Sequence, residues 1–220
     1  MKRFYILILA VSVVTSGVIG VSAELSSEHS IDITGSMDIP EQTVDTEWGE
    51  ATITEIGKEE AGESLRVSAD APKNNSYVIR IVDSDETRLA GKSVPGGDAD
   101  RSFSLNRYVP GTYVVAITQD RDTAHAVEPF VVKGYTVEQS TSDVTAGTNI
   151  NIDIQLTEVN SRTSSPQAVN VTLYGDDVMR LTEATKINKT NYEASFRTDQ
   201  IPTGTYEIYS AVETTGDIYE

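Results

Sequence analysis

The feature that most constrains the fold of this chain is an alternation of apolar and polar residues that recurs along nearly its whole length. In GTNINIDIQL (147–156), isoleucine or leucine alternates with Asn, Asp or Gln. A half-buried β-strand requires this period of two, whereas the apolar residues of an amphipathic helix recur every three to four positions. The same pattern appears in further segments: ESLRVSA, SYVIRIV, TYVVAIT, AVNVTLY and YEASF. Short strands at this spacing predict an all-β sandwich or barrel.

These segments belong to two copies of one module. AGESLRVSA (61–69) aligns with AGTNINIDI (146–154) at an offset of 85 residues. YVIRIV (77–82) then aligns with VNVTLY (169–174) at an offset of 92 residues, and SFSLNRYVPGTY (102–113) aligns with SFRTDQIPTGTY (195–206) at an offset of 93 residues. The change of offset places an insertion in the Ser/Thr-rich segment TEVNSRTSSP, because surface loops tolerate insertions. The sequence therefore predicts a duplicated module of about 90 residues.

The recurring Ser-Phe…Gly-Thr-Tyr motif predicts which kind of sandwich each copy forms. In immunoglobulin-like sandwiches, a tyrosine at the start of the penultimate strand hydrogen-bonds back to the preceding corner, an arrangement called a tyrosine corner. Tyr113 and Tyr206 occupy this position in the two copies, so we expect them to be structural rather than catalytic. We predict two tandem immunoglobulin-like (Greek-key) β-sandwiches, over residues 24–134 and 135–220.

The second copy is expected to lack its last strand. In the first copy, AVEPFVVKG (126–134) follows the Tyr113 strand, and Pro129 favours a place at a sheet edge. The equivalent segment would begin near residue 219, whereas the sequence ends at Glu220. Three explanations are open: TGDIYE pairs as a stub, the chain is truncated, or a partner donates the strand to an open edge.

Residues 1–23 are predicted to be a signal peptide. Lys2 and Arg3 precede an apolar run, and Val21-Ser22-Ala23 supplies the small-residue cleavage pattern. The alternative is an uncleaved membrane anchor, since the run approaches the lower limit for crossing a bilayer. Small polar residues interrupt the run and favour cleavage. Either way, the bulk of the chain is expected to be secreted or to lie at the extracellular cell surface.

The charge balance narrows the range of partners. The chain has 34 acidic and 17 basic residues and a net charge of −17, which argues against nucleic acid as a partner. Cations and basic surfaces are better candidates as partners than nucleic acid, and the charge also fits an environment of concentrated salt. Dispersed acidic residues are typical of a protein that stays hydrated in high salt; ordinary solubility in dilute solution is the alternative explanation. The absence of cysteine excludes disulfides and thiolate metal sites.

The sequence offers no catalytic constellation. Its two histidines, His29 and His125, are expected in an N-terminal tail and in a loop before an edge strand. Neither a Ser-His-Asp triad nor a histidine cluster can be assembled from these parts, and glycine-rich phosphate motifs are absent. We therefore predict no catalytic residue, no cofactor and no metal site, and no small-molecule substrate is evident.

Two weaker candidates for binding remain. The acidic loops DSDE (83–86) and GGDAD (96–100) carry carboxylates that a hard cation could use, but they lack calcium-loop spacing, which favours solvated loops. The lone tryptophan, Trp48, is expected to cap the edge of a core; stacking against a sugar is the alternative.

Three sequons are candidate N-glycosylation sites, at Asn74, Asn170 and Asn188. Asn74 and Asn188 fall in predicted turns, and Asn170 falls on the wet face of a predicted strand. All three would be accessible to a glycosyltransferase on the export side.

The order of these motifs resembles that of a known group of proteins. The leader is followed by IDITGSMDIPEQTV, SFSLNRYVPGTYVVAI, EPFVVKGYTVE and ATKINKTNYEASF. This order resembles secreted surface proteins of halophilic archaea that carry tandem immunoglobulin-like domains. The resemblance implies an exported cell-surface or envelope protein without a catalytic site.

The expected function is that of a non-enzymatic structural or adhesive protein of the cell surface. Its expected partners are other surface proteins, or a second copy through an open strand edge, with the membrane involved only if the leader is retained. The alternative is a carbohydrate- or cation-binding accessory module of an envelope enzyme system, using Trp48 or the acidic loops.

Overall fold

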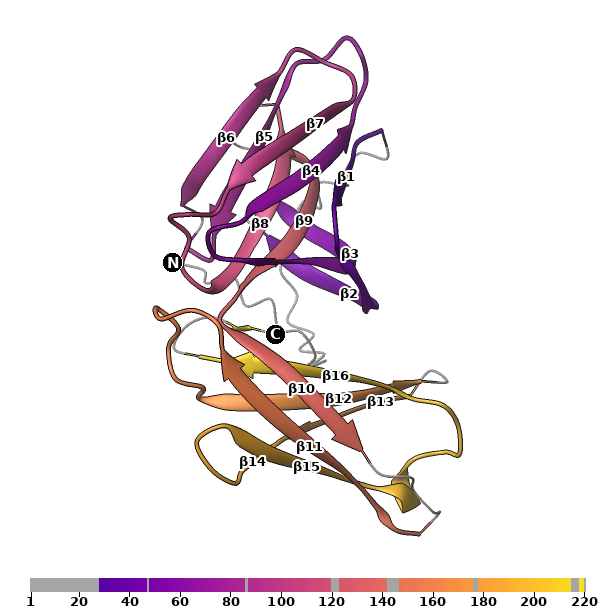
Figure 1. Cartoon of the computed structure of the whole chain (residues 1–220). Coiled ribbons are helices and arrows are strands. Elements are labelled where there is room, and N and C mark those ends of the chain that lie inside the picture. Colours follow the sequence, from indigo (N-terminus) through magenta and orange to yellow (C-terminus); the bar gives the residue numbers. More distant parts are fainter. Residues whose placement is uncertain are drawn as a thin grey trace. The chain divides into compact units, whose positions relative to one another are not determined.

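The computed structural model describes residues 28–46, 48–85, 87–119, 123–141, 147–175, 178–214 and 218–219 (Figure 1). These ranges consist almost entirely of strands and loops, and the one helical turn within them is the 3-10 turn η1 (Thr198–Gln200). The signal peptide predicted at residues 1–23 lies outside the described residues. Within the ranges given, no helix has the length and apolarity needed to cross a membrane.

The chain divides into two compact units close to the expected boundary, with the first ending at Val132 and the second beginning at Lys133. The strands of the first unit are β1 (Ser30–Ile33), β2 (Met37–Thr46), β3 (Gly49–Glu60), β4 (Ser64–Asp70), β5 (Tyr77–Asp83), β6 (Arg88–Val94), β7 (Ala99–Ser104), β8 (Gly111–Thr118) and β9 (Ala124–Lys133). They form a three-stranded sheet, β1-β4-β7, and a six-stranded sheet, β2-β3-β9-β8-β5-β6.

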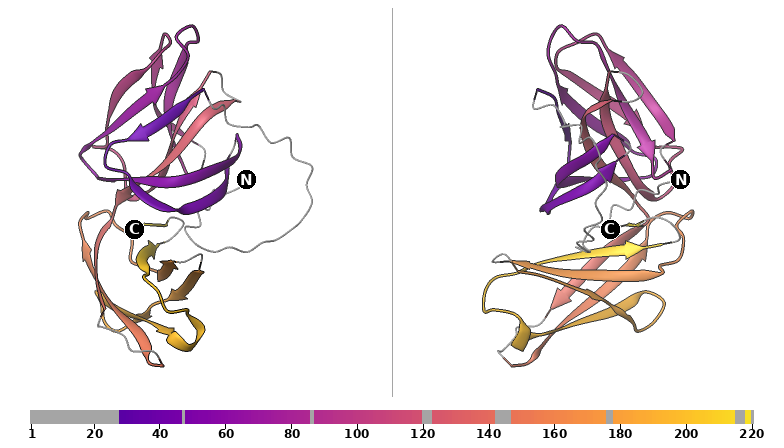
Figure 2. Two further views of the ribbon diagram at one scale, coloured as in Figure 1. Left: turned by 90° about the vertical axis from the view of Figure 1, so that its right-hand side faces the viewer. Right: turned by 180° about the vertical axis from the view of Figure 1, so that it is seen from behind.

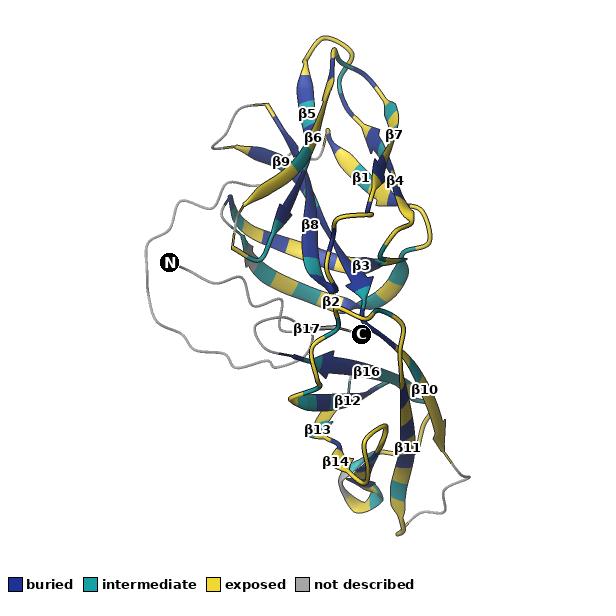
Figure 3. Cartoon of the chain, turned by 60° about the vertical axis from the view of Figure 1, so that its left-hand side comes forward, coloured by how far each residue is buried: buried dark blue, intermediate teal, exposed yellow. Residues whose placement is uncertain are grey.

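The core of the first unit lies between these two sheets. Its apolar residues come from the alternating segments, as the period of two predicts. The inward residues of three strands all lie in one buried cluster: Leu65, Val67 and Ala69 of β4, Tyr77, Ile79 and Ile81 of β5, and Tyr113, Val115 and Ile117 of β8. The alternation of buried and exposed residues is visible along the strands in Figure 3.

The second unit repeats this layered arrangement. Its strands are β10 (Tyr135–Thr141), β11 (Asn149–Glu158), β12 (Ala168–Gly175), β13 (Val178–Glu183), β14 (Thr185–Lys186), β15 (Asn191–Arg197), β16 (Glu207–Glu213) and β17 (Ile218–Tyr219). They form the sheets β10-β11-β15-β14 and β13-β12-β16-β17. A short break at the buried Ala184 passes the chain from β13 in one sheet to β14 in the other.

The two units share one topology. The order β1-β4-β7 in the first corresponds to β10-β11-β15 in the second, and β9-β8-β5-β6 corresponds to β17-β16-β12-β13. Each unit is an immunoglobulin-like Greek-key sandwich, so the predicted fold class is confirmed. Figure 2 shows the two sheets of each unit as separate layers.

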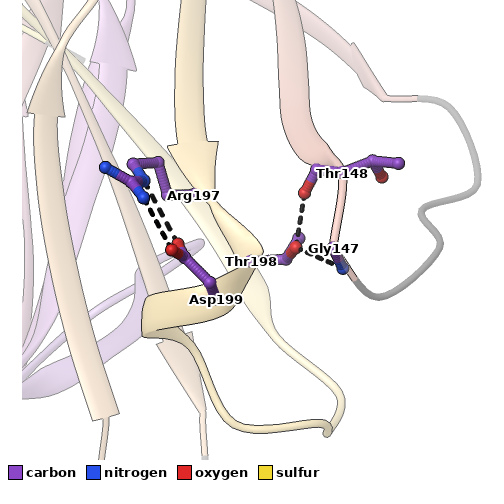
Figure 4. Close-up of polar contacts among 5 residues, drawn as sticks. All are labelled: Gly147, Thr148, Arg197, Thr198 and Asp199. Carbon is purple, nitrogen blue, oxygen red and sulfur yellow. Dashed lines mark hydrogen bonds and ion pairs between the residues drawn. The ribbon is translucent and has the colours of Figure 1, made fainter.

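Equivalent contacts recur at the offsets found in the sequence. Gly62 and Gly147 both adopt positive φ, at 99° and 90°, a conformation that glycine reaches without steric cost. The N–H of Gly62 donates to the carbonyl of Leu105 at 3.3 Å. The N–H of Gly147 donates instead to the hydroxyl of Thr198 at 3.0 Å, and that hydroxyl donates to the carbonyl of Thr148 (Figure 4). A backbone contact in one copy is thus replaced by a side-chain contact in the other.

An exposed ion pair lies beside this contact in the second unit. The guanidinium of Arg197 meets the carboxylate of Asp199 at 2.6 Å (Figure 4). Both side chains are more than half exposed, so water and salt screen the pair and it adds little stability.

The two units differ most where each last strand lies. The hairpin β2–β3, which the sequence analysis did not predict, joins the sheet beside β9. The prediction that Pro129 marks an edge strand is therefore wrong, because β9 lies between β3 and β8. A proline removes only its own N–H donor, so the other residues of the strand still pair on both sides. In the second unit the last strand is the two-residue β17, which pairs only with Val212 and Glu213 of β16.

Candidate functional site

Both corner tyrosines make the hydrogen bond that defines a tyrosine corner. The hydroxyl of Tyr113 donates to the carbonyl of Val109 at 2.8 Å, and that of Tyr206 donates to the carbonyl of Pro202 at 2.9 Å. Each bond reaches back four residues, to positions that are themselves related by the offset of 93 residues. The ring of Tyr113 also stacks on Phe130 at 5.4 Å in the core. These contacts stabilise the corners and offer no reactive group.

The structure brings together the two histidines, which the sequence analysis placed apart. His29 directly precedes β1 and is only 9 % exposed, and His125 lies within β9 rather than in a loop. Their rings stack with centroids 4.4 Å apart and planes 15° from parallel. Sequence spacing gave no signal for this pair, because β1 and β9 belong to different sheets and their approach depends on how the sandwich closes.

The histidine pair lies in a polar cleft of about 220 Å³, which we call the histidine cleft. Residues from β1, β3 and β9 line it, and the ionisable groups among them are His29, His125, Glu55 and Glu128. Ser30, Thr52 and Thr54 add hydroxyl groups, and the described residues that line the cleft include no Lys or Arg.

The electrostatics of the cleft favour neutral forms of its buried groups. Burial raises the pKa of Glu128 to about 8, with further increases from the charges of Glu55 and Asp32; a hydrogen bond from the backbone of Ile33 acts in the opposite direction. Burial is also the largest cause of the lowered pKa of His29, followed by the neighbouring His125, while Glu28 raises it. Near neutral pH, therefore, Glu128 holds its proton and His29 is uncharged.

Several polar atoms of the cleft have no hydrogen-bond partner among the residues that the structure describes. They are Nδ1 and Nε2 of His29, Nε2 of His125 and Oε1 of Glu128. Glu128 is 5 % exposed and lies on the inward face of its sheet, opposite the core residue Val115. Buried polar atoms without partners are uncommon and costly, and they require a structural or functional explanation.

The second unit has a different kind of candidate site, the open edge of β16. The carbonyl of Glu213 accepts a hydrogen bond from the N–H of Gln167, which leads into β12, at 2.8 Å. Backbone groups alternate in direction along a strand, so Ile208 and Ser210 face away from β12. Since β17 pairs with β16 only at Val212 and Glu213, no strand among the described residues covers this part of the edge.

One side chain spans the open edge. Gln139 of β10 donates its amide N–H to the carbonyl of Ile208 at 2.9 Å, and its amide oxygen accepts from the hydroxyl of Ser210 at 2.8 Å. Gln139 pairs with the core residue Ile154 on β11, so it occupies the core-facing side of its sheet. The strand pattern alone gives no reason for a polar residue at this inward position. Its hydrogen bonds to β16, in the opposite sheet, supply the reason.

Trp48 does not present its ring for stacking. It is 6 % exposed and packs with Val82, Val114, Ala116 and Ala124 in a small cluster. Two of these residues, Val114 and Ala116, lie on the face of β8 opposite the main core. Trp48 is therefore buried in a small cluster of its own rather than at the edge of the main core, and this burial contradicts sugar stacking on its ring.

Two carboxylates of the acidic loops, those of Asp83 and Asp100, are engaged in local structure. Oδ1 of Asp83 accepts from the N–H groups of Asp85 and Thr87, at 3.1 and 2.8 Å. Oδ1 of Asp100 accepts from the hydroxyl of Ser68 at 2.6 Å. Across the described ranges, no three or more His, Asp or Glu side chains are grouped to hold a metal ion.

The three sequons differ in accessibility. Asn74 and Asn188 are exposed, and Oδ1 of Asn188 accepts from the N–H groups of Thr190 and Asn191. Asn170 is half-buried on β12, and the sequon threonine Thr172 is 2 % exposed. Glycosylation at these positions remains a prediction.

Comparison with known proteins adds no family assignment. No protein-family model matches the sequence, and no curated protein matches it. Among solved structures, a fragment of native alpha-2-macroglobulin from Escherichia coli is similar, with 12% identity, a TM-score of 0.37, and coverage of 73% of this chain and 88% of that one.

Two further structures are similar to the chain. The human OSCAR ligand-binding domain has 13% identity, a TM-score of 0.28, and coverage of 74% of this chain and 89% of its own. The BSP domain of a biofilm associated protein has 16% identity, a TM-score of 0.29, and coverage of 84% of this chain and 28% of its own. At these identities and TM-scores, the likeness assigns no function to the chain.

Proposed function

We propose that the chain is an exported, non-enzymatic protein of the cell surface, and that its second domain joins a neighbouring surface protein by accepting a strand at the open edge of β16. The observation that carries this proposal is the extent of β17, which pairs only with Val212 and Glu213. The equivalent position in the first domain is filled by the ten-residue β9.

Backbone chemistry supports strand addition at this edge. The outward groups of Ile208 and Ser210 can pair with any extended segment, as in other complexes formed by strand addition. Within the described part of the chain, the carbonyl of Ile208 accepts a hydrogen bond from the Gln139 side chain. An incoming strand would replace that single side-chain bond with a continuous ladder.

Apolar residues beside the edge support the same proposal. Val137, Tyr206 and Ile208 pack against the core of the second unit but remain only partly buried. Every second side chain of a strand added to β16 would face the core and cover these residues. The burial of apolar surface would then stabilise the complex in addition to the backbone hydrogen bonds.

The charge of the chain restricts the occupant. With a net charge of −17, the protein repels acidic segments at low ionic strength. We therefore propose as occupant an extended segment of another surface protein that alternates apolar residues and carries no net negative charge. Concentrated salt, which screens such repulsion, fits the proposed setting of an acidic surface protein.

A synthetic peptide with the β9 sequence AHAVEPFVVK provides a defined probe of the edge. We expect saturable binding to the full chain in molar salt, with slowed hydrogen exchange at the amide of Ser210. Ser210→Pro removes the outward N–H and should weaken binding by about tenfold or more, whereas Ser210→Ala keeps the N–H and should bind like the wild type.

Hydrogen exchange measured on the wild-type protein tests the proposal even if a variant fails to fold. Slowed exchange confined to β16 on peptide addition supports the proposal. Absence of peptide binding, together with unchanged exchange along β16, contradicts it.

A further inference from the structure

We propose that the histidine cleft of the first domain binds a single sugar residue, an uncharged ring that carries several hydroxyl groups. The inference rests on buried polar atoms of His29, His125 and Glu128, on the parallel arrangement of the two imidazole rings, and on a lining that combines polar and apolar groups. It concerns the first domain and is independent of strand addition to the second.

Packing of the sandwich does not account for the polar residues of the cleft. The inward neighbours of Glu128 along β9 are the core residues Ala126 and Phe130, so a carboxyl group interrupts an apolar row. Glu128 and His29 are 5 % and 9 % exposed, and Oε1 of Glu128 and both nitrogens of His29 lack hydrogen-bond partners among the described residues. Burial of such atoms without partners is costly. An ionisable group perturbed by burial in a cleft is therefore a candidate for ligand binding.

The protonation states indicate an uncharged ligand. Near neutral pH, Glu128 holds its proton and His29 is uncharged, so neither offers a full charge to an ion. The charges of Glu28, Asp32 and Glu55 act on these two residues and would repel an anion. A cation would meet the protonated carboxyl group of Glu128 rather than a carboxylate.

The same protonation states select the hydrogen-bonding groups of the ligand. A neutral imidazole has one N–H donor and one acceptor nitrogen, and a protonated carboxyl group has an O–H donor and an acceptor oxygen. The ligand must therefore both donate and accept, as every hydroxyl group does. Ser30, Thr52 and Thr54 add hydroxyl groups to the lining, and these can also take either role.

The geometry of the rings favours a ligand with several such groups. The rings of His29 and His125 stack with centroids 4.4 Å apart and planes 15° from parallel. Ring nitrogens make hydrogen bonds in the plane of the ring, so the nitrogens of two stacked rings reach separate ligand atoms rather than one shared atom. Hydroxyl groups on different carbons of a sugar ring provide such separate atoms.

The size and apolar part of the cleft fit one sugar residue. The volume of about 220 Å³ lies below the range of about 300–1,000 Å³ that is usual for drug-sized ligands. Ile31, Ile53 and Val127 also line the cleft, and their side chains can cover the C–H groups of a sugar ring while its hydroxyl groups meet the polar side. A small carboxamide presents one oxygen and one nitrogen, and it would leave more of the buried atoms without partners.

Titration of the untagged full-length protein with methyl glycosides of glucose, galactose, mannose and N-acetylglucosamine tests the proposal. The chain has only two histidines, so the imidazole signals in an NMR spectrum report on the cleft alone. We expect at least one glycoside to shift both signals in a saturable way at neutral pH, whereas methylammonium, acetate and acetamide should not. Disaccharides with the same terminal sugar then show whether the ligand is a free sugar or the end of a glycan.

Variants of Glu128 and a change of pH test the hydrogen-bonding role of its carboxyl group. Glu128→Leu should weaken glycoside binding at neutral pH by about tenfold or more, whereas Glu128→Gln keeps an uncharged donor and acceptor and should bind like the wild type. Because the pKa of Glu128 is about 8, wild-type binding should fall by about tenfold at about pH 9, and that of Glu128→Gln should persist. Asp98→Asn, in an exposed loop outside the cleft, should leave binding unchanged.

Three results would overturn the proposal. One is an absence of imidazole shifts in the wild type with every glycoside, which would show that water alone satisfies the buried atoms. Another is binding of methylammonium or acetate as tight as that of the glycosides. The third is equal glycoside affinity of the wild type and Glu128→Leu. The titration and pH profile of the wild type decide the matter even if a variant does not fold.

Discussion

The amide of Gln139 and the hydroxyl of Ser210 join the two sheets of the second domain at their open side, with 2.8 Å between the amide oxygen and the hydroxyl oxygen. The same amide holds the carbonyl of Ile208. This side chain lies at the β16 edge, alongside the outward backbone groups that β17 leaves uncovered.

Loss of the Gln139 bridge should have two effects. Gln139→Ala should lower the free energy of unfolding of the second domain by about 1 kcal/mol, because two partly solvated hydrogen bonds disappear. It should also strengthen binding of the peptide AHAVEPFVVK, since the carbonyl of Ile208 becomes available. Peptide titration and denaturant unfolding measure the two effects, with Gln155→Ala on the exposed face of β11 as the control. Weaker peptide binding by Gln139→Ala would argue against competition for the edge.

Gly57 in β3 should not tolerate a side chain. A Cβ atom at this position would lie 2.7 Å from Cγ2 of Ile33 and 2.9 Å from Cβ of Phe130. Gly57→Ala should therefore destabilise the first domain by about 1–3 kcal/mol. Fluorescence of Trp48, the only tryptophan of the chain, reports unfolding of this domain alone.

Gly91→Ala in β6 is the matched control for Gly57→Ala. There a Cβ atom would meet only the flexible end of the Arg88 side chain, which can move away. We expect an unfolding midpoint close to that of the wild type. Equal unfolding midpoints for the two variants would show that Ile33 and Phe130 leave room for a methyl group at Gly57.

Glu128 should make the first domain less stable as the pH rises. Its pKa is raised from 4.5 to about 8 in the folded protein, so between these values the folded state holds a proton that the unfolded state releases. Stability from this group is complete below about pH 4.5 and is lost progressively up to about pH 8. Glu128→Gln should flatten the dependence of Trp48-monitored unfolding on pH in this window, whereas Glu138→Gln on the exposed face of β10 should not. An unchanged slope in Glu128→Gln would contradict the assignment.

The two tyrosine corners should contribute unequally to the stability of their domains. Tyr113 is 5 % exposed, whereas Tyr206 is only partly buried, so water can replace the lost bond more easily at Tyr206. Tyr113→Phe should cost about 1.5 kcal/mol and Tyr206→Phe about 0.5 kcal/mol. Denaturant unfolding, monitored by hydrogen exchange of amides in each domain, measures the loss of stability in the domain that carries the substitution. A larger loss at Tyr206 would be inconsistent with the observed burial.

Glycosylation should favour the exposed sequons. Asn74 and Asn188 lie in exposed turns, whereas Asn170 is half-buried and its sequon threonine Thr172 is buried. We expect higher occupancy at Asn74 and Asn188 than at Asn170 in protein from its native source. Peptide mass mapping measures the occupancies, and unmodified asparagine at all three positions would rule the modification out.

The alternation of residues was sufficient to predict the strands and much of the core. Leu65, Ile79 and Val115 fall on the apolar face of alternating segments and lie in the core, because side chains on a strand alternate between its two faces, whatever lies beyond them. The repeat offsets likewise related Gly62 to Gly147, because a duplicated strand and turn keep their local backbone requirements. The hairpin β2–β3 was missed, although its burial also alternates in part.

Only the tertiary structure decided which strand lies beside which and what meets at the edges. Backbone donors and acceptors are the same in nearly every residue, so alternation could not reveal that β3 covers β9, or that Gln139 reaches β16. The stacking of His29 on His125 has the same origin, since it depends on the closure of two sheets. The sequence by itself determined two immunoglobulin-like sandwiches, because alternation is a local property of each strand; pairing between distant segments decided the histidine cleft and the extent of the open edge of β16.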